Sequence, residues 1–209
     1  MPLSLVGSEM CIRDRSKSII NECNKIKRDI SAQDINSRKD LRSLNFVTID
    51  GSNAKDFDDA VYAEESSDGF LLYVAIADVS AYVLQDSSLD KEALSRATSV
   101  YFEKKVIPML PELISNKLCS LRPNEDKLVL ACEIYLDREG EIKSYEFFNS
   151  VICSKYRLTY DEVEKFYQKG QTTLSDDIVS NLSTLKKIHA LRRKIREERK
   201  AIDFYLPEY

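Results

Sequence analysis

The sequence predicts an α+β fold with a mixed, largely antiparallel sheet and flanking helices. Strand and helix patterns alternate irregularly along the 209 residues, without the regular β-α succession of a doubly wound fold. Two pairs of β-prone runs are each joined by short turn signals, which is typical of hairpins. The composition, 43% hydrophobic and 32% charged, is that of a globular chain with a substantial core.

The N-terminal part of the chain shows the weakest patterns. Residues 1–15 have neither a helical nor a strand period, and we expect them to be a non-native tail. Residues 16–43 are polar with scattered basic side chains, and we interpret them as a linker with a short helix. The stronger patterns begin afterwards, so we place the folded domain at residues 44–209.

The first strand signals surround a run of acidic residues. Residues 46–49 are β-prone and deliver Asp50 at their end, just before the turn signal Gly51-Ser52-Asn53. Residues 60–64 and 70–77 are rich in Val, Ile, Tyr and Ala, and the segment between them supplies turn residues. This pattern predicts a hairpin with the acidic run at its mouth.

Four aspartates within this stretch give the strongest functional signal: Asp50, Asp56, Asp58 and Asp59. Two unit charges about 4 Å apart repel by roughly 4 kcal/mol at an effective dielectric constant near 20, so converging carboxylates favour a bound cation. In a regular strand Asp59 would face away from its neighbours, so convergence requires a curled loop, with Phe57 anchored in the core. An EF-hand is excluded because glycine and glutamate are missing from the required positions.

Three helices and a second hairpin are predicted in the rest of the chain. Residues 89–97 have helical composition, and residues 128–136 and 142–152 form a hairpin pattern. Residues 159–162 match a capping box, which marks the start of a helix. A last long helix is predicted at 177–200, with an apolar stripe and a basic face that is either a solvated surface or a phosphate contact.

The totals exclude several classes of protein. A net charge of -4 and a pI of about 5.3 argue against a wholly basic nucleic-acid-binding chain. Five scattered cysteines with one histidine support neither a zinc knuckle nor a disulfide framework, and a reducing setting fits them best. No apolar run approaches the roughly 18 residues needed to cross a bilayer. We therefore expect a cytoplasmic protein without a membrane partner.

Several blocks together carry a family resemblance: TIDGSNAKDFDDAVYAE, LYVAIADVSAYV, TSVYF, VIPMLPELISNKLCSL, RLTYDEV and REERKAIDF. They resemble the catalytic RNB domain of the ribonuclease II/ribonuclease R family, with a closer likeness to ribonuclease R, from about residue 40 to the C-terminus. The resemblance implies the N-terminal half of that domain. It also implies a hydrolytic, processive 3′-to-5′ exoribonuclease that depends on Mg²⁺ and releases nucleoside 5′-monophosphates.

The same resemblance assigns roles to individual residues. It implies that Asp50, Asp56 and Asp59 bind the metal and that Asp58 is the residue most closely tied to catalysis. Tyr101 matches a tyrosine that packs against the 3′-terminal nucleotide, and Tyr160 matches one that recognises the ribose. The expected partner is single-stranded RNA bound by its 3′ end, and the expected full-length protein is a monomer.

The sequence also departs from the family pattern. The full RNB domain is longer, and its late arginine would lie beyond Tyr209; the cold-shock and S1 modules that flank the domain are also missing. We therefore expect the isolated chain to be weakly active or inactive. Two alternatives remain open: a truncated, non-catalytic RNA-binding fragment of such an enzyme, and a structural loop stabilised by Ca²⁺.

Overall fold

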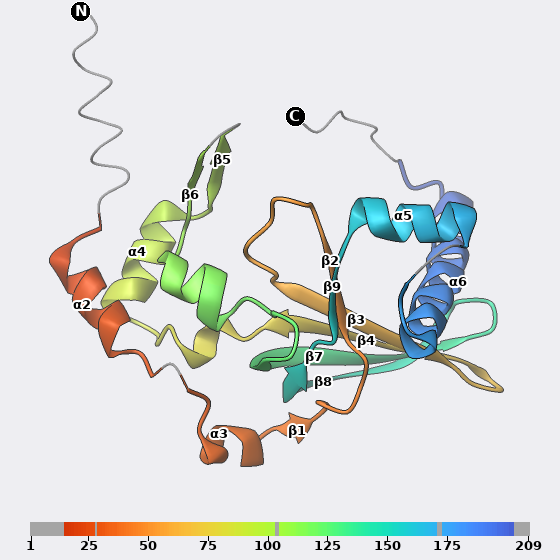
Figure 1. Cartoon of the computed structure of the whole chain (residues 1–209), viewed down its shortest axis with the longest axis horizontal. Coiled ribbons are helices and arrows are strands. Elements are labelled where there is room, and N and C mark those ends of the chain that lie inside the picture. Colours follow the sequence, from red (N-terminus) through yellow and green to blue (C-terminus); the bar gives the residue numbers. More distant parts are fainter. Residues whose placement is uncertain (1–14, 28, 103–104, 171–172, 203–209) are drawn as a thin grey trace, which may run out of the picture. The chain divides into compact units, whose positions relative to one another are not determined.

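The computed structural model describes residues 15–27, 29–102, 105–170 and 173–202 (Figure 1). They form two compact units, one from residues within 1–29 and 79–118 and one from residues within 30–78 and 119–209. The predicted non-native tail, 1–15, lies outside the described residues except for Arg15. Within the described part of the chain, no helix is both long and apolar enough to cross a bilayer.

The first unit is mainly helical. Its elements are α2 (Lys17–Lys25), a 3₁₀ turn (Val79–Ala81), α4 (Ser88–Arg96), β5 (Val100–Phe102), β6 (Lys105–Ile107) and a π-helical turn (Ile114–Leu118). Glu22 on α2 accepts hydrogen bonds from the amides of Ser88 and Leu89, the first two residues of α4, at 3.0 and 3.3 Å. The Ser87 side chain caps α4 as well. Helix α4 therefore begins where the sequence predicts.

The second unit is built on a seven-stranded sheet with the order β1-β8-β7-β4-β3-β2-β9. The strands are β1 (Lys39–Asp40), β2 (Val47–Asp50), β3 (Asp59–Glu65), β4 (Gly69–Ala77), β7 (Asp126–Asp137), β8 (Ile142–Cys153) and β9 (Tyr156–Thr159). Only the outermost pairs, β1 with β8 and β2 with β9, are parallel. The predicted α+β class with a largely antiparallel sheet is confirmed.

Both predicted hairpins form in this sheet. Strands β3 and β4 pair from Asp59 opposite Ile76 to Glu65 opposite Phe70, and β7 pairs with β8 along almost its whole length. Gly69 opens β4 at a point where an added Cβ would lie 1.9 Å from the Leu136 carbonyl oxygen. Only glycine fits there, because the neighbouring strand's backbone approaches so closely.

Three helices complete the second unit: α3 (Ala32–Asn36), α5 (Tyr160–Lys169) and α6 (Asp176–Glu198). The capping box predicted at residues 159–162 is present at the start of α5, and Gly170 ends that helix in the left-handed conformation. The predicted apolar stripe of α6 supplies Ile178, Leu182 and Ile188 to the core. Ile178 and Leu182 pack in one cluster with residues of β2, β9 and α5. Ile188 packs in a second cluster with residues of β3, β4 and β7.

One polar side chain interrupts this apolar face of α6. Asn181 is only 1% exposed; its Oδ1 accepts from the amide of Ala63 at 2.9 Å and its Nδ2 donates to the carbonyl of Asn45 at 3.0 Å. These two backbone groups lie just beyond the Val47–Val61 pair that joins β2 to β3. The Asn181 side chain thus supplies the hydrogen bonds that these two backbone groups would otherwise make to each other, and it connects α6 to β3, the strand that carries Asp59.

Candidate active site

The candidate site begins where β2 ends and β3 starts. Asp50 is the last residue of β2 and Asp59 is the first residue of β3. Because these strands are antiparallel neighbours, the end of one and the start of the other lie at the same edge of the sheet. Residues 51–58 join them outside helices and strands. We call residues 50–59 the aspartate loop; the predicted curled segment is therefore confirmed for residues 51–58, while Asp59 belongs to the strand.

The middle of the aspartate loop is hydrogen-bonded to the segment before β7. Ser120 is completely buried; its Oγ donates to the Lys55 carbonyl at 3.1 Å and accepts from the Phe57 amide at 3.2 Å. The Leu121 amide donates to the Phe57 carbonyl at 2.8 Å. These bonds fix the backbone on both sides of Asp56.

The start of the loop is held from β9 by Arg157. Its Nη2 donates to the carbonyls of Gly51 and Ser52 at 2.7 and 3.0 Å, and its guanidinium carbon lies 5.4 Å from the centre of the Phe57 ring. Phe57 is only half-buried, so the expectation that it anchors the loop in the core is wrong. The ring packs against the arginine instead, which is a favourable cation–π arrangement.

Sequence reasoning assigned no role to Arg157 or Ser120. Both occur in blocks that resemble the family, but each reaches the loop from a distant part of the chain, 106 positions from Gly51 for the arginine and 63 positions from Phe57 for the serine. The parallel pairing of β2 with β9 brings the arginine there. No local sequence pattern predicts such a contact, because the contact depends on which strands pair in the sheet.

The carboxylates of the loop influence one another. Burial raises the pKa of Asp50, and repulsion from Asp59 adds to the rise, while Arg157 opposes it. Desolvation by the surrounding chain also raises the pKa of Asp58, followed by repulsion from Asp56 and then from the other two aspartates, although much of this residue's surface is exposed. The four side chains are thus close enough to influence one another's pKa values.

The fit of this loop to a divalent cation rests on its donor atoms. Carboxylate oxygens are the hard ligands that Mg²⁺ prefers. Asp50 Oδ2 is buried and makes no hydrogen bond of ordinary geometry, although, against the rise that burial causes, the neighbouring Thr48 hydroxyl lowers the pKa of this carboxyl. Among the described residues, however, no group of three or more Asp, Glu, His or Cys side chains is arranged to hold a metal ion. The chemistry of the loop fits a metal, but the predicted set of Asp50, Asp56 and Asp59 is not assembled as a ligand shell in this structure.

The two predicted RNA-contacting tyrosines lie in different units. Tyr160 is the first residue of α5 and 64% exposed, and it follows Thr159, which pairs with Asp50 across β9 and β2. It is therefore placed at the same edge of the sheet as the aspartate loop. Tyr101 lies on β5 and is 67% exposed, in a short hairpin with β6.

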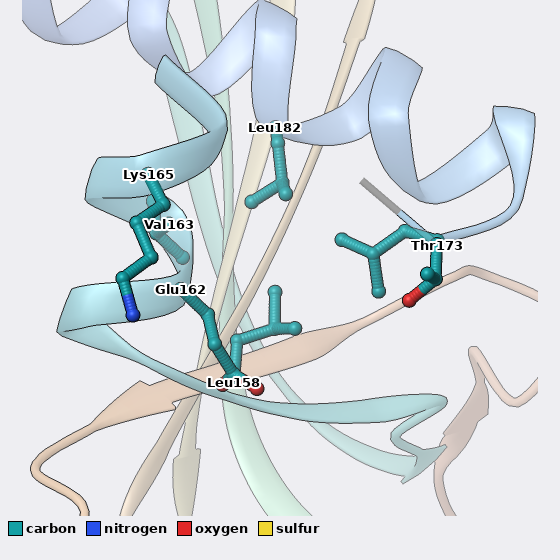
Figure 2. Close-up of a pocket in the computed structure, with 7 residues that line it drawn as sticks. Leu158, Glu162, Val163, Lys165, Thr173 and Leu182 are labelled. Atoms are coloured by element: carbon teal, nitrogen blue, oxygen red, sulfur yellow. The ribbon is translucent and has the colours of Figure 1, made fainter. Parts of the chain in front are cut away.

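A separate apolar pocket of about 400 Å³ lies between β9, α5 and α6. Figure 2 shows Leu158 from β9 and Leu182 from α6 pointing toward one another across it. Glu162 and Lys165 from α5 also line the pocket. None of the predicted site residues contributes to its lining, so the pocket is distinct from the aspartate loop.

Comparison with known proteins agrees with this architecture. Ribonuclease R of Acidithiobacillus ferrooxidans is 48% identical over 169 residues, which are 80% of this chain and 38% of that protein. A solved structure of Mycoplasma genitalium RNase R in complex with ribose methylated single-stranded RNA superposes with a TM-score of 0.88 at 36% identity, over 93% of this chain and 31% of the other. The chain thus spans less than two-fifths of either protein.

The fold is also found in the solved structure of a pseudonuclease. Yeast Ssd1, a pseudonuclease, matches with a TM-score of 0.69 at 22% identity, which shows a shared fold and nothing more. The profile of the RNB domain matches residues 38–209, which include the whole aspartate loop and all strands of the seven-stranded sheet. The chain therefore belongs to the RNB domain family.

Proposed function

We propose that this chain carries the aspartate half of the active site of a 3′-to-5′ hydrolytic exoribonuclease that releases nucleoside 5′-monophosphates. The observation that carries the proposal is the aspartate loop itself: four carboxylates in mutual electrostatic range at one sheet edge, with a buried oxygen on Asp50 that makes no hydrogen bond of ordinary geometry. The relatives named ribonuclease R supply the reaction class and the substrate class, RNA.

In this proposal Asp50, Asp56 and Asp59 hold Mg²⁺. Bound there, Mg²⁺ would neutralise charge on the scissile phosphate, lower the pKa of a water molecule and stabilise the leaving oxygen. The chain's own contribution is to supply hard oxygen ligands from a strand end, a loop and a strand start, whose side chains would turn toward the bound metal. The backbone contacts of Lys55 and Phe57 hold the middle ligand in place.

Asp58 acts in the proposal on the attacking water. Asp58 lies next to two of the proposed metal ligands, Asp56 and Asp59, so its carboxylate can accept the proton of a water molecule that enters the aspartate loop. Its backbone carbonyl accepts from the Ala77 amide at 2.9 Å, which extends the β3–β4 pairing by one residue and fixes the position of the side chain.

The tyrosines supply substrate binding that does not depend on sequence. Tyr101 stacks on the 3′-terminal base, and Tyr160, beside the aspartate loop, contacts the ribose. Stacking contributes about 1–3 kcal/mol per base whatever the base, which suits an enzyme that degrades RNA of any sequence.

The test uses the full-length protein in which this segment occurs and a labelled oligo(A). We expect Asp58→Asn to lower Mg²⁺-dependent shortening roughly 10²- to 10⁴-fold, the usual contribution of a general base, while RNA binding is retained. Asp68→Asn, in the exposed β3–β4 turn, is the matched control and should leave activity unchanged. Undiminished cleavage by the Asp58 variant would remove the assigned role.

A second candidate function is RNA binding without catalysis. The pseudonuclease Ssd1 shares the fold, and no metal-ligand shell is formed among the described residues. A protein of this kind would bind oligo(A) without shortening it at any Mg²⁺ concentration. The same assay therefore distinguishes the two functions.

A further inference from the structure

Two side chains outside the aspartate loop hold its backbone. Arg157 donates to the carbonyls of Gly51 and Ser52 near the start of the loop, and Ser120 is bonded to the groups on either side of Asp56. Between them they contact the loop at its start and at its middle. Neither is a carboxylate, so neither belongs to the predicted ligand set.

The arginine contact is specific to the shape of a guanidinium group. One terminal nitrogen donates to two successive carbonyls while the guanidinium carbon lies over the Phe57 ring, 5.4 Å from its centre. A lysine carries the same charge, but it is a point donor without a planar face, so it cannot place a flat group beside the Phe57 ring as arginine does. The conformation of residues 51–52 and the position of Phe57 are thereby coupled through one side chain.

The serine contact is specific to a buried hydroxyl group. Ser120 is 0% exposed, and its Oγ is donor to one loop group and acceptor from another. Removing the hydroxyl leaves the Lys55 carbonyl and the Phe57 amide, which are only partly buried here, without this partner. The loop backbone then moves until these two groups form other hydrogen bonds, because polar groups left unpaired in the protein cost free energy.

We propose that Arg157 and Ser120 are positioning residues that fix the path of the aspartate loop and so set its affinity for a divalent cation. The metal part of this inference rests on the proposed function; the effect on the loop's conformation does not. Groups that orient metal ligands without touching the metal commonly change affinity by roughly 10- to 100-fold when they are altered.

The chain offers a matched control for each residue. Arg138 makes the same kind of contact at the opposite end of β3: it donates to the carbonyls of Ser66 and Ser67 and lies 5.7 Å from the Phe70 ring. Ser150 is as buried as Ser120, but its hydroxyl has no hydrogen-bond partner. Both controls lie outside the aspartate loop.

The experiment compares Arg157→Lys, Arg157→Met and Ser120→Ala with Arg138→Lys and Ser150→Ala in the 209-residue chain. Three quantities are measured: the melting temperature, amide hydrogen exchange of residues 50–59 by mass spectrometry, and Mn²⁺ affinity by calorimetric titration. We expect faster exchange and roughly 10- to 100-fold weaker Mn²⁺ binding in the three loop-contact variants. The two control variants should match the wild type in the exchange rate of residues 50–59 and in Mn²⁺ affinity, even if their melting temperatures change.

The outcomes separate the inference from the proposed function. Wild-type exchange in the loop of all three variants overturns the positioning role, and so does a wild-type Mn²⁺ affinity in Arg157→Lys, since charge alone would then suffice. If the wild-type chain binds no Mn²⁺, the metal part of the proposed function fails. In that case faster exchange confined to the loop-contact variants still supports the positioning role, and unchanged exchange overturns it.

Discussion

Asp50 lies directly opposite Thr159 where β2 and β9 pair in parallel. Thr159 is also the N-cap of α5, so the strand end that carries a predicted metal ligand and the first turn of this helix share one edge of the sheet. Tyr160 follows immediately as the first helical residue. The start of α5 is therefore part of the surroundings of the candidate site, and its stability can be tested directly.

We expect Thr159→Ala to lower the free energy of unfolding by about 1 kcal/mol. The Thr159 hydroxyl accepts from the Glu162 amide at 3.2 Å, and alanine leaves that helical amide without its cap. Chemical denaturation followed by circular dichroism measures the loss. Ser175→Ala is the control, because Ser175 caps α6 without a side-chain hydrogen bond; equal losses in both variants would contradict the capping explanation.

The contribution of Glu162 should depend on pH. Hydrogen bonds from the Thr159 side chain and then its backbone hold the pKa of Glu162 below its ordinary value of 4.5. Because the pKa is lower in the folded state, the carboxylate stabilises the fold above pH 4.5 and loses this effect as the pH falls below it. The difference in unfolding free energy between the wild type and Glu162→Gln should therefore be larger at pH 7 than at pH 3. A gap of the same size at both pH values would argue against this linkage.

Asn181→Ala should destabilise the fold by about 2–4 kcal/mol, because each buried polar group left unpaired costs about 1–3 kcal/mol. Two such groups, the Ala63 amide and the Asn45 carbonyl, depend on this side chain. Thermal and denaturant unfolding measure the change. Asn149→Ala, at an exposed position of β8, should change stability by less than about 0.5 kcal/mol, and a similar loss there would show that the effect is not specific to the bridge.

Tyr101→Ala should weaken binding of single-stranded oligo(A), and Tyr101→Phe should not, since stacking requires the ring and not the hydroxyl group. A loss of about 1–3 kcal/mol corresponds to an affinity roughly 5- to 150-fold lower. Fluorescence anisotropy of a labelled oligonucleotide is the measurement. Tyr145 is 66% exposed, much like Tyr101 at 67%, so Tyr145→Ala tests whether any exposed tyrosine has the same effect.

The sequence predicted the parts of the fold that depend on neighbouring residues. The hairpins at β3–β4 and β7–β8, the capping box at Thr159 and the apolar stripe of α6 all repeat a short period or a turn pattern, and all are present. The order of the strands was not predictable in this way. The parallel pairing of β2 with β9 joins segments far apart in the chain, and no local pattern encodes it.

The same division applies to the candidate site. The aspartates were found because they are close in sequence; burial and, after it, repulsion among them raise the pKa values of Asp50 and Asp58. The residues that hold the loop were missed, since Arg157 and Ser120 reach it only after the sheet has formed. Phe57 was misjudged for a related reason: its apolar ring suggests the core, whereas a distant arginine provides its partner.

The contact between Arg157 and Gly51 spans 106 positions of the chain, and this separation bears on the order of events during synthesis. Contacts between distant segments form late, because a long loop must close first. A nascent chain that has emerged only as far as β8 contains every aspartate of the loop but not the arginine that holds it. Completion of the loop must therefore wait for β9, so a ribosome-bound chain acquires the native arrangement of these carboxylates only near the end of this segment's translation.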